Sequence, residues 1–332
     1  MIRLQIRRGA KKVKKQTITI FLLLLFVVFA GVLFFLMSRN GFVTVKKEGG
    51  RRFGATYMTM NNPFYEIIDD EIRSVLESRG DILITRDPAL SVDKQIDQIQ
   101  EFIDAKVEAI FINPVDWKAV GPVLSQAVEK GIPIIAVDSD IYDKDKVACT
   151  VVSDNYQAGV LCAQNLMSQM EGGNILLLTH KEAKSGLDRI RGFRETVAAT
   201  DTFQILAEGE CLGQLERAMP VTEALLKKYP QTNVVMCLND PAAMGAMAAL
   251  EDAGMTGKVA VYGVDGSPDG KSMIEEGIMT ATAAQFPRRL GREAAEAVYR
   301  ILNGETIEPV IKIPTELITV SNLKNYGSNG WQ

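Results

Sequence analysis

The sequence predicts an α/β protein with two similar lobes, each built on a parallel β-sheet with helices on both faces. Short runs rich in β-branched and aromatic residues alternate with segments of helical periodicity, and the alternation begins again after Ser153. The chain has 332 residues, which exceeds the length at which a single hydrophobic core usually stops growing. Two folded lobes, preceded by one transmembrane helix, are therefore expected.

The expected transmembrane helix is a long apolar run near the start of the sequence. Residues 17–37 contain no charged side chain and, at ~1.5 Å per residue, are long enough to cross ~30 Å of hydrocarbon. The run exceeds the about 7 to 15 residues of a signal-peptide core, and no small-x-small cleavage site follows it. We expect a retained single-pass anchor, with a cleaved secretory signal as the alternative.

The residues on either side of this run predict its orientation. Residues 1–16 carry seven Lys and Arg side chains and no acidic one. Because positive charge stays on the cytoplasmic side, we expect residues 1–16 in the cytoplasm and the ligand-binding domain outside the cell membrane. Residues 38–52 contain three glycines and a short charged stretch, which suits a flexible linker.

Strand-like and helix-like patterns alternate through the rest of the chain. Residues 67–76, for example, place isoleucine, valine and leucine at helical spacing between two strand-like runs. Such alternation favours parallel strands connected by helices. The runs predicted as strands are 53–59, 81–85, 109–113 and 132–138 before Ser153, and 174–179, 203–207, 233–238 and 258–264 after it.

The composition argues against several classes of function. Setting aside the seven basic residues of 1–16 leaves 37 − 7 = 30 basic against 41 acidic residues, a balance of −11. Nucleic acid binding needs clustered Lys and Arg, so no nucleic acid partner is expected. The four cysteines form no C-x-x-C pair and the single histidine, His180, has no companions at metal-ligand spacing. We expect no metal and no cofactor, and buried free thiols, with one disulfide as the alternative.

Polar side chains follow several of the predicted strands. In open α/β sheets the ligand crevice lies beyond the carboxyl ends of the strands, so these side chains are expected to meet in one cleft. The alternative for each one is a helix cap or turn residue, a role that Asn and Asp favour. The six residues at these positions are Asn61, Asn62, Asn113, Asp138, Asn239 and Asp265.

Seven short motifs occur in a characteristic order along the two lobes. They are Asn61-Asn62-Pro63-Phe64-Tyr65, Ile112-Asn113-Pro114, Val137-Asp138, Arg189 through Gly192-Phe193, Asn239-Asp240, Gly263-Val264-Asp265-Gly266 and Ala284-Gln285. Together they resemble the ribose-binding branch of the periplasmic sugar receptors, which is related to the core domain of the lactose-repressor family. The resemblance extends from Phe53 to about Thr319.

This resemblance implies the type I periplasmic binding protein fold, with two Rossmann-like lobes joined by a hinge of three chain crossings. The first lobe is expected at 53–153 plus about 286–312, and the second at 154–285 plus about 313–325. The family binds a sugar between its lobes. The positions that match its ligand contacts are Asn62, Phe64, Tyr65, Asn113, Asp138, Arg189, Asn239, Asp265 and Gln285.

The chemistry of these residue types suits a neutral polyol. Carboxylates accept from hydroxyl groups, a guanidinium donates through a planar fork, and amides do both. Aromatic faces pack on the C–H side of a pyranose or furanose ring. We expect a monosaccharide, either a pentose or a hexose, as the ligand.

Departures from the family pattern leave the ligand's identity open. Ser139 stands where the family commonly has Arg, Met58 where a polar residue is expected, and Gly213 at or near an expected aromatic. Ribose, xylose, another pentose, a larger hexose and a furanone-type signal remain alternatives. Trp117, expected to open a helix after Pro114, is interpreted as packing or rim.

No catalytic residue is expected. Asp138 and Asp265 could serve a glycosidase as acid and base, but the many hydrogen-bond donors around them are expected to keep both ionised. No nucleophile elbow and no P-loop is present in the sequence. An anchor in place of a helix-turn-helix excludes a repressor. The expected partner is an ABC sugar permease or a membrane sensor histidine kinase, and the sequence favours neither.

Overall fold

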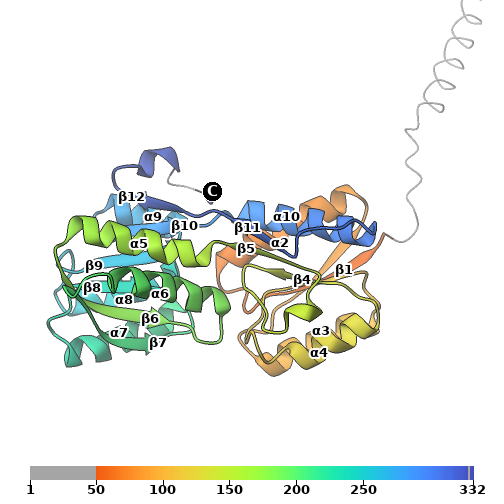
Figure 1. Ribbon diagram of the computed structural model, residues 1–332, viewed down its shortest axis with the longest axis horizontal. Helices are drawn as coiled ribbons and strands as arrows, with labels where there is room; N and C mark the ends of the chain where they lie inside the picture. The colour runs from red at the N-terminus through yellow and green to blue at the C-terminus, as the bar shows by residue number, and fades with distance from the viewer. Residues whose placement is uncertain (1–49, 328–329) are drawn as a thin grey trace, which may run out of the picture. The chain divides into compact units, whose positions relative to one another are not determined.

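The computed structural model describes residues 50–327 and 330–332 and shows two six-stranded sheets (Figure 1). The prediction of a two-lobed α/β fold with parallel sheets is confirmed. The basic segment 1–16, the anchor expected at 17–37 and residues 38–49 of the expected linker lie outside the described residues. Within the described part of the chain, no helix is long and apolar enough to span a membrane.

The first lobe has a parallel sheet in the order β11-β5-β4-β3-β1-β2. Figure 1 shows α2 and α10 over one face of this sheet and α3 and α4 over the other. The elements are β1 (Arg52–Thr56), α2 (Pro63–Ser78), β2 (Ile82–Arg86), α3 (Val92–Asp104), β3 (Ile110–Ile112), α4 (Gly121–Glu129), β4 (Ile134–Val137), the short 3₁₀ turn η1 (Lys144–Lys146), β5 (Cys149–Ser153), α10 (Pro287–Leu302) and β11 (Val310–Ile313).

Alternating side chains of the strands form a separate core on each face of this sheet. Ile110 and Ile112 pack with the helices α3 and α4, whereas Phe111 between them packs with α2 and α10. Because successive strand residues point to opposite faces, a run that is apolar throughout is needed where both faces are covered. The run Ile110–Ile112 meets that need and is completely buried.

The second lobe has the sheet order β12-β10-β9-β8-β6-β7. Its strands are parallel except β12, which pairs antiparallel with β10. The elements are α5 (Asn155–Gln169), β6 (Gly173–Thr179), α6 (Lys184–Val197), β7 (Phe203–Glu210), α7 (Leu215–Lys228), β8 (Val234–Cys237), α8 (Asp240–Asp252), β9 (Ala260–Asp265), α9 (Pro268–Glu275), β10 (Ala281–Ala284), β12 (Glu316–Thr319) and the 3₁₀ turn η2 (Leu323–Asn325).

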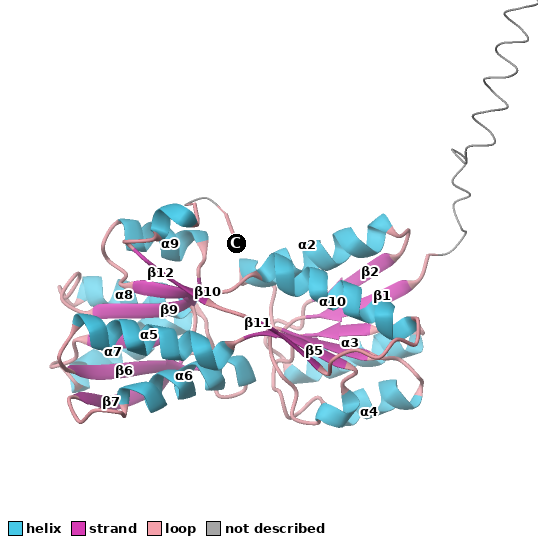
Figure 2. Cartoon of the chain, turned by 45° about the horizontal axis from the view of Figure 1, so that its top comes forward, coloured by secondary structure: helices cyan, strands magenta, loops and turns pink. Residues whose placement is uncertain are grey.

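Three connections in the described chain lead from one sheet to the other. They join β5 to α5, β10 to α10, and β11 to β12, and Figure 2 shows β5, β11 and β10 meeting where the lobes adjoin. Four strands of the structure, β5, β10, β11 and β12, are not among those predicted from the sequence. β10 is rich in alanine, and β11 and β12 are edge strands with exposed residues, so their patterns are weak.

Two smaller expectations have different outcomes. The helix expected to begin at Trp117 is wrong in its start, because Trp117 lies in a turn and α4 begins only at Gly121. The prediction of buried free thiols is confirmed for Cys149, Cys162, Cys211 and Cys237.

Candidate ligand-binding site

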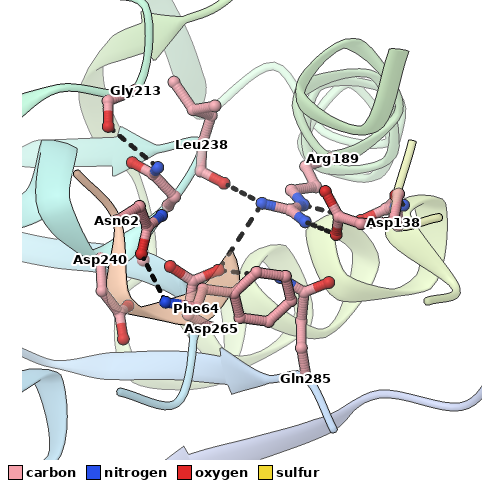
Figure 3. Close-up of polar contacts among 12 residues, drawn as sticks. Asn62, Phe64, Asp138, Arg189, Gly213, Leu238, Asp240, Asp265 and Gln285 are labelled. Carbon is pink, nitrogen blue, oxygen red and sulfur yellow. Dashed lines mark hydrogen bonds and ion pairs between the residues drawn. The ribbon is translucent and has the colours of Figure 1, made fainter. Parts of the chain in front are cut away.

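A small cavity lies at the carboxyl ends of strands from both sheets, and Figure 3 shows the polar contacts around it. Eight of the nine residues predicted for the site line it, and Asn113 does not. The lining residues named in the prediction are Asn62, Phe64, Tyr65, Asp138, Arg189, Asn239, Asp265 and Gln285. The polar residues that end separate strands are thus brought together, as the crevice rule for α/β sheets anticipates.

Asp138 directly follows β4 and has its backbone in the left-handed region, at φ 67°. Its Oδ2 accepts a hydrogen bond of 3.1 Å from Nδ2 of Asn113, which also donates to the carbonyl of Val137. Its Oδ1 is buried and has no hydrogen-bond partner among the described residues. Asn113, which is fully buried, therefore acts as the support that orients Asp138.

Asp265 holds the equivalent place at the end of β9 in the second lobe, also with a positive φ, of 144°. Its Oδ1 accepts a hydrogen bond of 2.8 Å from Nε2 of Gln285. Oδ2 of Asp265 and Oε1 of Gln285 are both buried without a hydrogen-bond partner in the described chain. Strained backbone at both aspartates is a feature typical of functional sites.

Arg189 projects from α6 between the two carboxylates (Figure 3). Its Nε donates to Oδ1 of Asn155 at 2.8 Å, and Nη1 donates to the carbonyl of Leu238 at 3.0 Å. Its guanidinium lies 3.8 Å from Oδ1 of both Asp138 and Asp265. These distances are too long for hydrogen bonds, so the guanidinium and the two carboxyl groups interact through their charges alone and form no hydrogen bond with one another.

Asn62 and Asn239 each serve as a helix cap and also line the cavity, the two roles between which the sequence did not decide. Each is the N-cap of a helix, and its side chain accepts from the backbone N–H of Phe64 or Ala242. Each also lines the cavity. Nδ2 of Asn239 donates to the carbonyl of Gly213 at 3.0 Å, so this amide has less hydrogen-bonding capacity left than the carboxylates.

Burial raises the pKa of both carboxyl groups. For Asp138 the charge of Arg189 and the hydrogen bond from Asn113 oppose burial only in part, and the pKa rises to about 6. For Asp265 burial and the charge of Asp240 raise the pKa well above its ordinary value. The donors around the two aspartates therefore offset only part of the effect of burial, because each aspartate keeps one oxygen without a donor among the described residues.

The lobes touch directly beside the cavity. The backbone N–H of Trp117 donates to the carbonyl of Glu182 at 3.1 Å, and the N–H of Ser185 donates to Oγ of Ser139 at 3.2 Å. Ser139, where the family commonly has Arg, thus contacts the opposite lobe. The cavity volume is about 20 Å³, room for a single water-sized group. A monosaccharide is larger than this volume.

Six further residues that line the cavity were not singled out from the sequence as candidates for it: His180, Ala183, Ser185, Leu212, Gln214 and Leu238. His180 directly follows β6, and burial lowers its pKa to about 4, so its imidazole is neutral at pH 7. A signal for His180 exists in the sequence, because His180 directly follows the predicted strand 174–179, and Asp138 likewise stands at a strand end. The loop around Leu212 gives no such signal.

Comparison with known proteins agrees with this geometry. A periplasmic binding protein domain model matches residues 53–306. The ribose import binding protein RbsB of Escherichia coli is 29% identical over 262 residues, covering 78% of this chain and 88% of that protein.

Two solved structures extend the comparison. An ABC transporter solute binding protein of Bacillus halodurans with bound myo-inositol is 25% identical, with a TM-score of 0.79, covering 84% of this chain and 98% of that chain. A periplasmic solute binding protein of an ABC transporter from Actinobacillus succinogenes, with bound D-allose, is 26% identical, with a TM-score of 0.76 and coverage of 83% and 100%. Both bound molecules are neutral polyols.

Proposed function

This chain belongs to the periplasmic binding protein domain family, and we propose that it binds a monosaccharide or a related neutral polyol between its two lobes. In this proposal the protein binds the ligand and does not catalyse a reaction on it. The proposal draws on the chemistry of the residues that line the cavity. It also draws on one relative that is named for ribose and on two solved structures with bound myo-inositol and D-allose.

One observation carries the proposal: three buried oxygens around the cavity have no hydrogen-bond partner among the described residues. They are Oδ1 of Asp138, Oδ2 of Asp265 and Oε1 of Gln285. A buried acceptor without a donor costs about 1 to 3 kcal/mol, so native proteins rarely keep three together. Hydroxyl groups of a polyol are donors of the right kind and number. Phe64 and Tyr65 supply aromatic faces for its C–H groups.

A thermal-shift panel on the full-length chain tests this function. D-ribose, D-allose, D-xylose, xylitol, myo-inositol and a furanone are each added at millimolar concentration. A sugar at ~100 times its dissociation constant adds ~2.7 kcal/mol to the free energy of unfolding, which raises the melting temperature by several degrees. Failure of every polyol to raise it, beside a positive result with a furanone, would overturn the sugar assignment.

The cell-membrane location is part of the proposal. The apolar run 17–37, with its basic flank, is proposed to hold the ligand-binding domain on the extracytoplasmic side. In that place the domain delivers sugar to an ABC permease or signals to a membrane sensor histidine kinase. Relatives described as ABC transporter solute binding proteins favour the permease, whereas a spanning helix that can pack against a partner's helices favours the kinase.

Ligand affinity is expected to rise with pH between about pH 5 and pH 7. In this structure the cleft between the lobes is contracted, with room for only a single water-sized group, and Asp138 has a pKa of about 6. Hydroxyl donors to its free Oδ1 favour the charged carboxylate and lower this pKa, so binding releases a proton below about pH 6. The dissociation constant at about pH 5 should be up to about tenfold larger than at about pH 7.5.

Calorimetric titration with the most stabilising sugar of the panel measures this pH dependence. Asp138→Asn is the matched control, because asparagine keeps the size and tolerates the positive φ but cannot titrate. Its affinity should be lower, and its pH dependence should be weaker than that of the wild type, because Asp265 is then the cavity carboxyl group that still titrates. Equal wild-type affinity at both pH values would show that Asp138 accepts no hydrogen bond from the ligand.

A further inference from the structure

Residues 330–332 lie beside the cavity and contact both lobes. The labelled end of the chain stands between α9 of the second lobe and α2 of the first (Figure 2). These three residues are Gly330, Trp331 and Gln332. None of them belongs to the three connections between the sheets, so they provide an additional link between the lobes.

Hydrogen bonds attach residues 330–332 to the second lobe. Lys271 of α9 is fully buried, and its Nζ donates to the carbonyl of Gly330 at 2.6 Å and to that of Tyr326 at 3.4 Å. Nε2 of Gln332 donates to the carbonyl of Gly266 at 3.1 Å. Gly266 directly follows Asp265, so this attachment lies next to a cavity carboxylate.

Trp331 makes the contact with the first lobe. Its ring meets the ring of Phe64 edge-on, with 5.6 Å between the centroids and 63° between the planes. It packs against the core that contains Phe64 and Ile68 of α2. Phe64 in turn lines the cavity. Such an edge-to-face pair has a preferred geometry, so Trp331 restricts the orientation of the Phe64 ring.

We propose that Trp331 is a positioning residue for the ligand: it holds Phe64 against the cavity and joins α2 to the second lobe when the cleft is contracted. Lys271 and Gln332 keep Trp331 in place. This inference rests on the proposed function for its effect on sugar affinity, but its structural part stands apart from the identity of the ligand. Opening of the lobes must separate Trp331 from Phe64 or detach it from α9.

Two substitutions at one position, measured in the full-length chain, test the proposal. Trp331→Ala should weaken the affinity for the most stabilising sugar of the panel about three- to tenfold, because the aromatic pair is lost. Trp331→Phe keeps an aromatic ring and should restore most of the affinity. Trp117→Phe is the matched control for removing a tryptophan, because Trp117 does not line the cavity and its hydrogen bond to the opposite lobe uses the backbone N–H. Phenylalanine also keeps an aromatic ring toward Lys184, whose Nζ lies 5.9 Å from the centroid of the Trp117 ring.

Hydrogen exchange without any sugar supplies the second measurement. The amides of the first turn of α2, residues 64–68, should exchange faster in Trp331→Ala than in the wild type and return toward the wild-type rate in Trp331→Phe. Unchanged exchange in Trp331→Ala would overturn the proposal whatever the ligand. Faster exchange in a chain that binds no polyol would uphold the link between the lobes and refute the proposed function. Faster exchange with wild-type sugar affinity would refute the positioning role.

Discussion

Arg189→Ala is expected to reduce sugar affinity by at least about thirtyfold, the largest effect of any single substitution in the cleft. The guanidinium stands between Asp138 and Asp265 and lies 3.8 Å from an oxygen of each. Its removal leaves two buried carboxyl groups facing the ligand without a compensating charge. Truncating one partner of such a buried charge arrangement costs about 2 to 5 kcal/mol.

Calorimetric titration compares Arg189→Ala with Arg189→Lys. Lysine restores the charge but has no planar fork, so it cannot reproduce both donations, to Asn155 and to the carbonyl of Leu238. We expect Arg189→Lys to bind more tightly than Arg189→Ala and more weakly than the wild type. Circular dichroism checks that each variant is folded. Wild-type affinity in a folded Arg189→Ala protein would contradict the position assigned to the ligand.

Asp265→Asn is expected to change affinity and stability in opposite directions. Loss of the charged acceptor removes hydrogen bonds worth about 1.5 to 3 kcal/mol, so sugar affinity falls about tenfold or more. The same change removes a buried carboxyl group whose pKa is raised well above its ordinary value, chiefly by burial. The melting temperature of the sugar-free protein should therefore rise by about 2 °C or more at neutral pH.

The pH dependence of this gain follows from the direction of the pKa shift. A carboxyl group with a raised pKa in the folded state favours folding most below its unfolded pKa of about 3.9, and that contribution is lost as pH rises through the folded value. Asparagine does not titrate. The gain in melting temperature should thus be larger at about pH 7.5 than at about pH 4.5, as scanning calorimetry can measure.

Asp240→Asn is the matched control, because Asp240 is a buried carboxylate with a structural role. Its Oδ2 accepts from the N–H and the hydroxyl of Ser267, and its Oδ1 accepts from the hydroxyl of Thr282. An amide cannot accept at both positions, so this substitution should lower the melting temperature. A lower melting temperature in Asp265→Asn as well would show that Asp265 is also structural.

Periodicity and strand-end position carried most of the information about the fold. The continuous apolar run around Phe111 predicts a strand covered on both faces, and the structure has one there. The strand-end rule brings Asp138 and Asp265 to one cavity although 127 positions separate them in sequence. Arg189 lies on a helix, where that rule does not apply, and only the family resemblance identified it.

Other properties of the site depend on distances that no local pattern encodes. The pKa values of the two aspartates follow from which oxygens have donors, and the sequence does not show that Arg189 stays 3.8 Å from each. Asn113 stands at a strand end like the other residues predicted to contact the ligand, yet its amide orients Asp138. Trp331 meets Phe64 across 267 positions of sequence, a contact without any periodic signal.

A crystal structure of the chain grown with the most stabilising sugar of the panel tests the central claim most directly. The claim predicts one sugar between the lobes, with hydroxyl groups within about 3 Å of Oδ1 of Asp138, Oδ2 of Asp265 and Oε1 of Gln285. These are the three acceptors that the contracted cleft leaves unpaired among the described residues. A sugar bound elsewhere, or one that leaves these oxygens without donors, would contradict the claim.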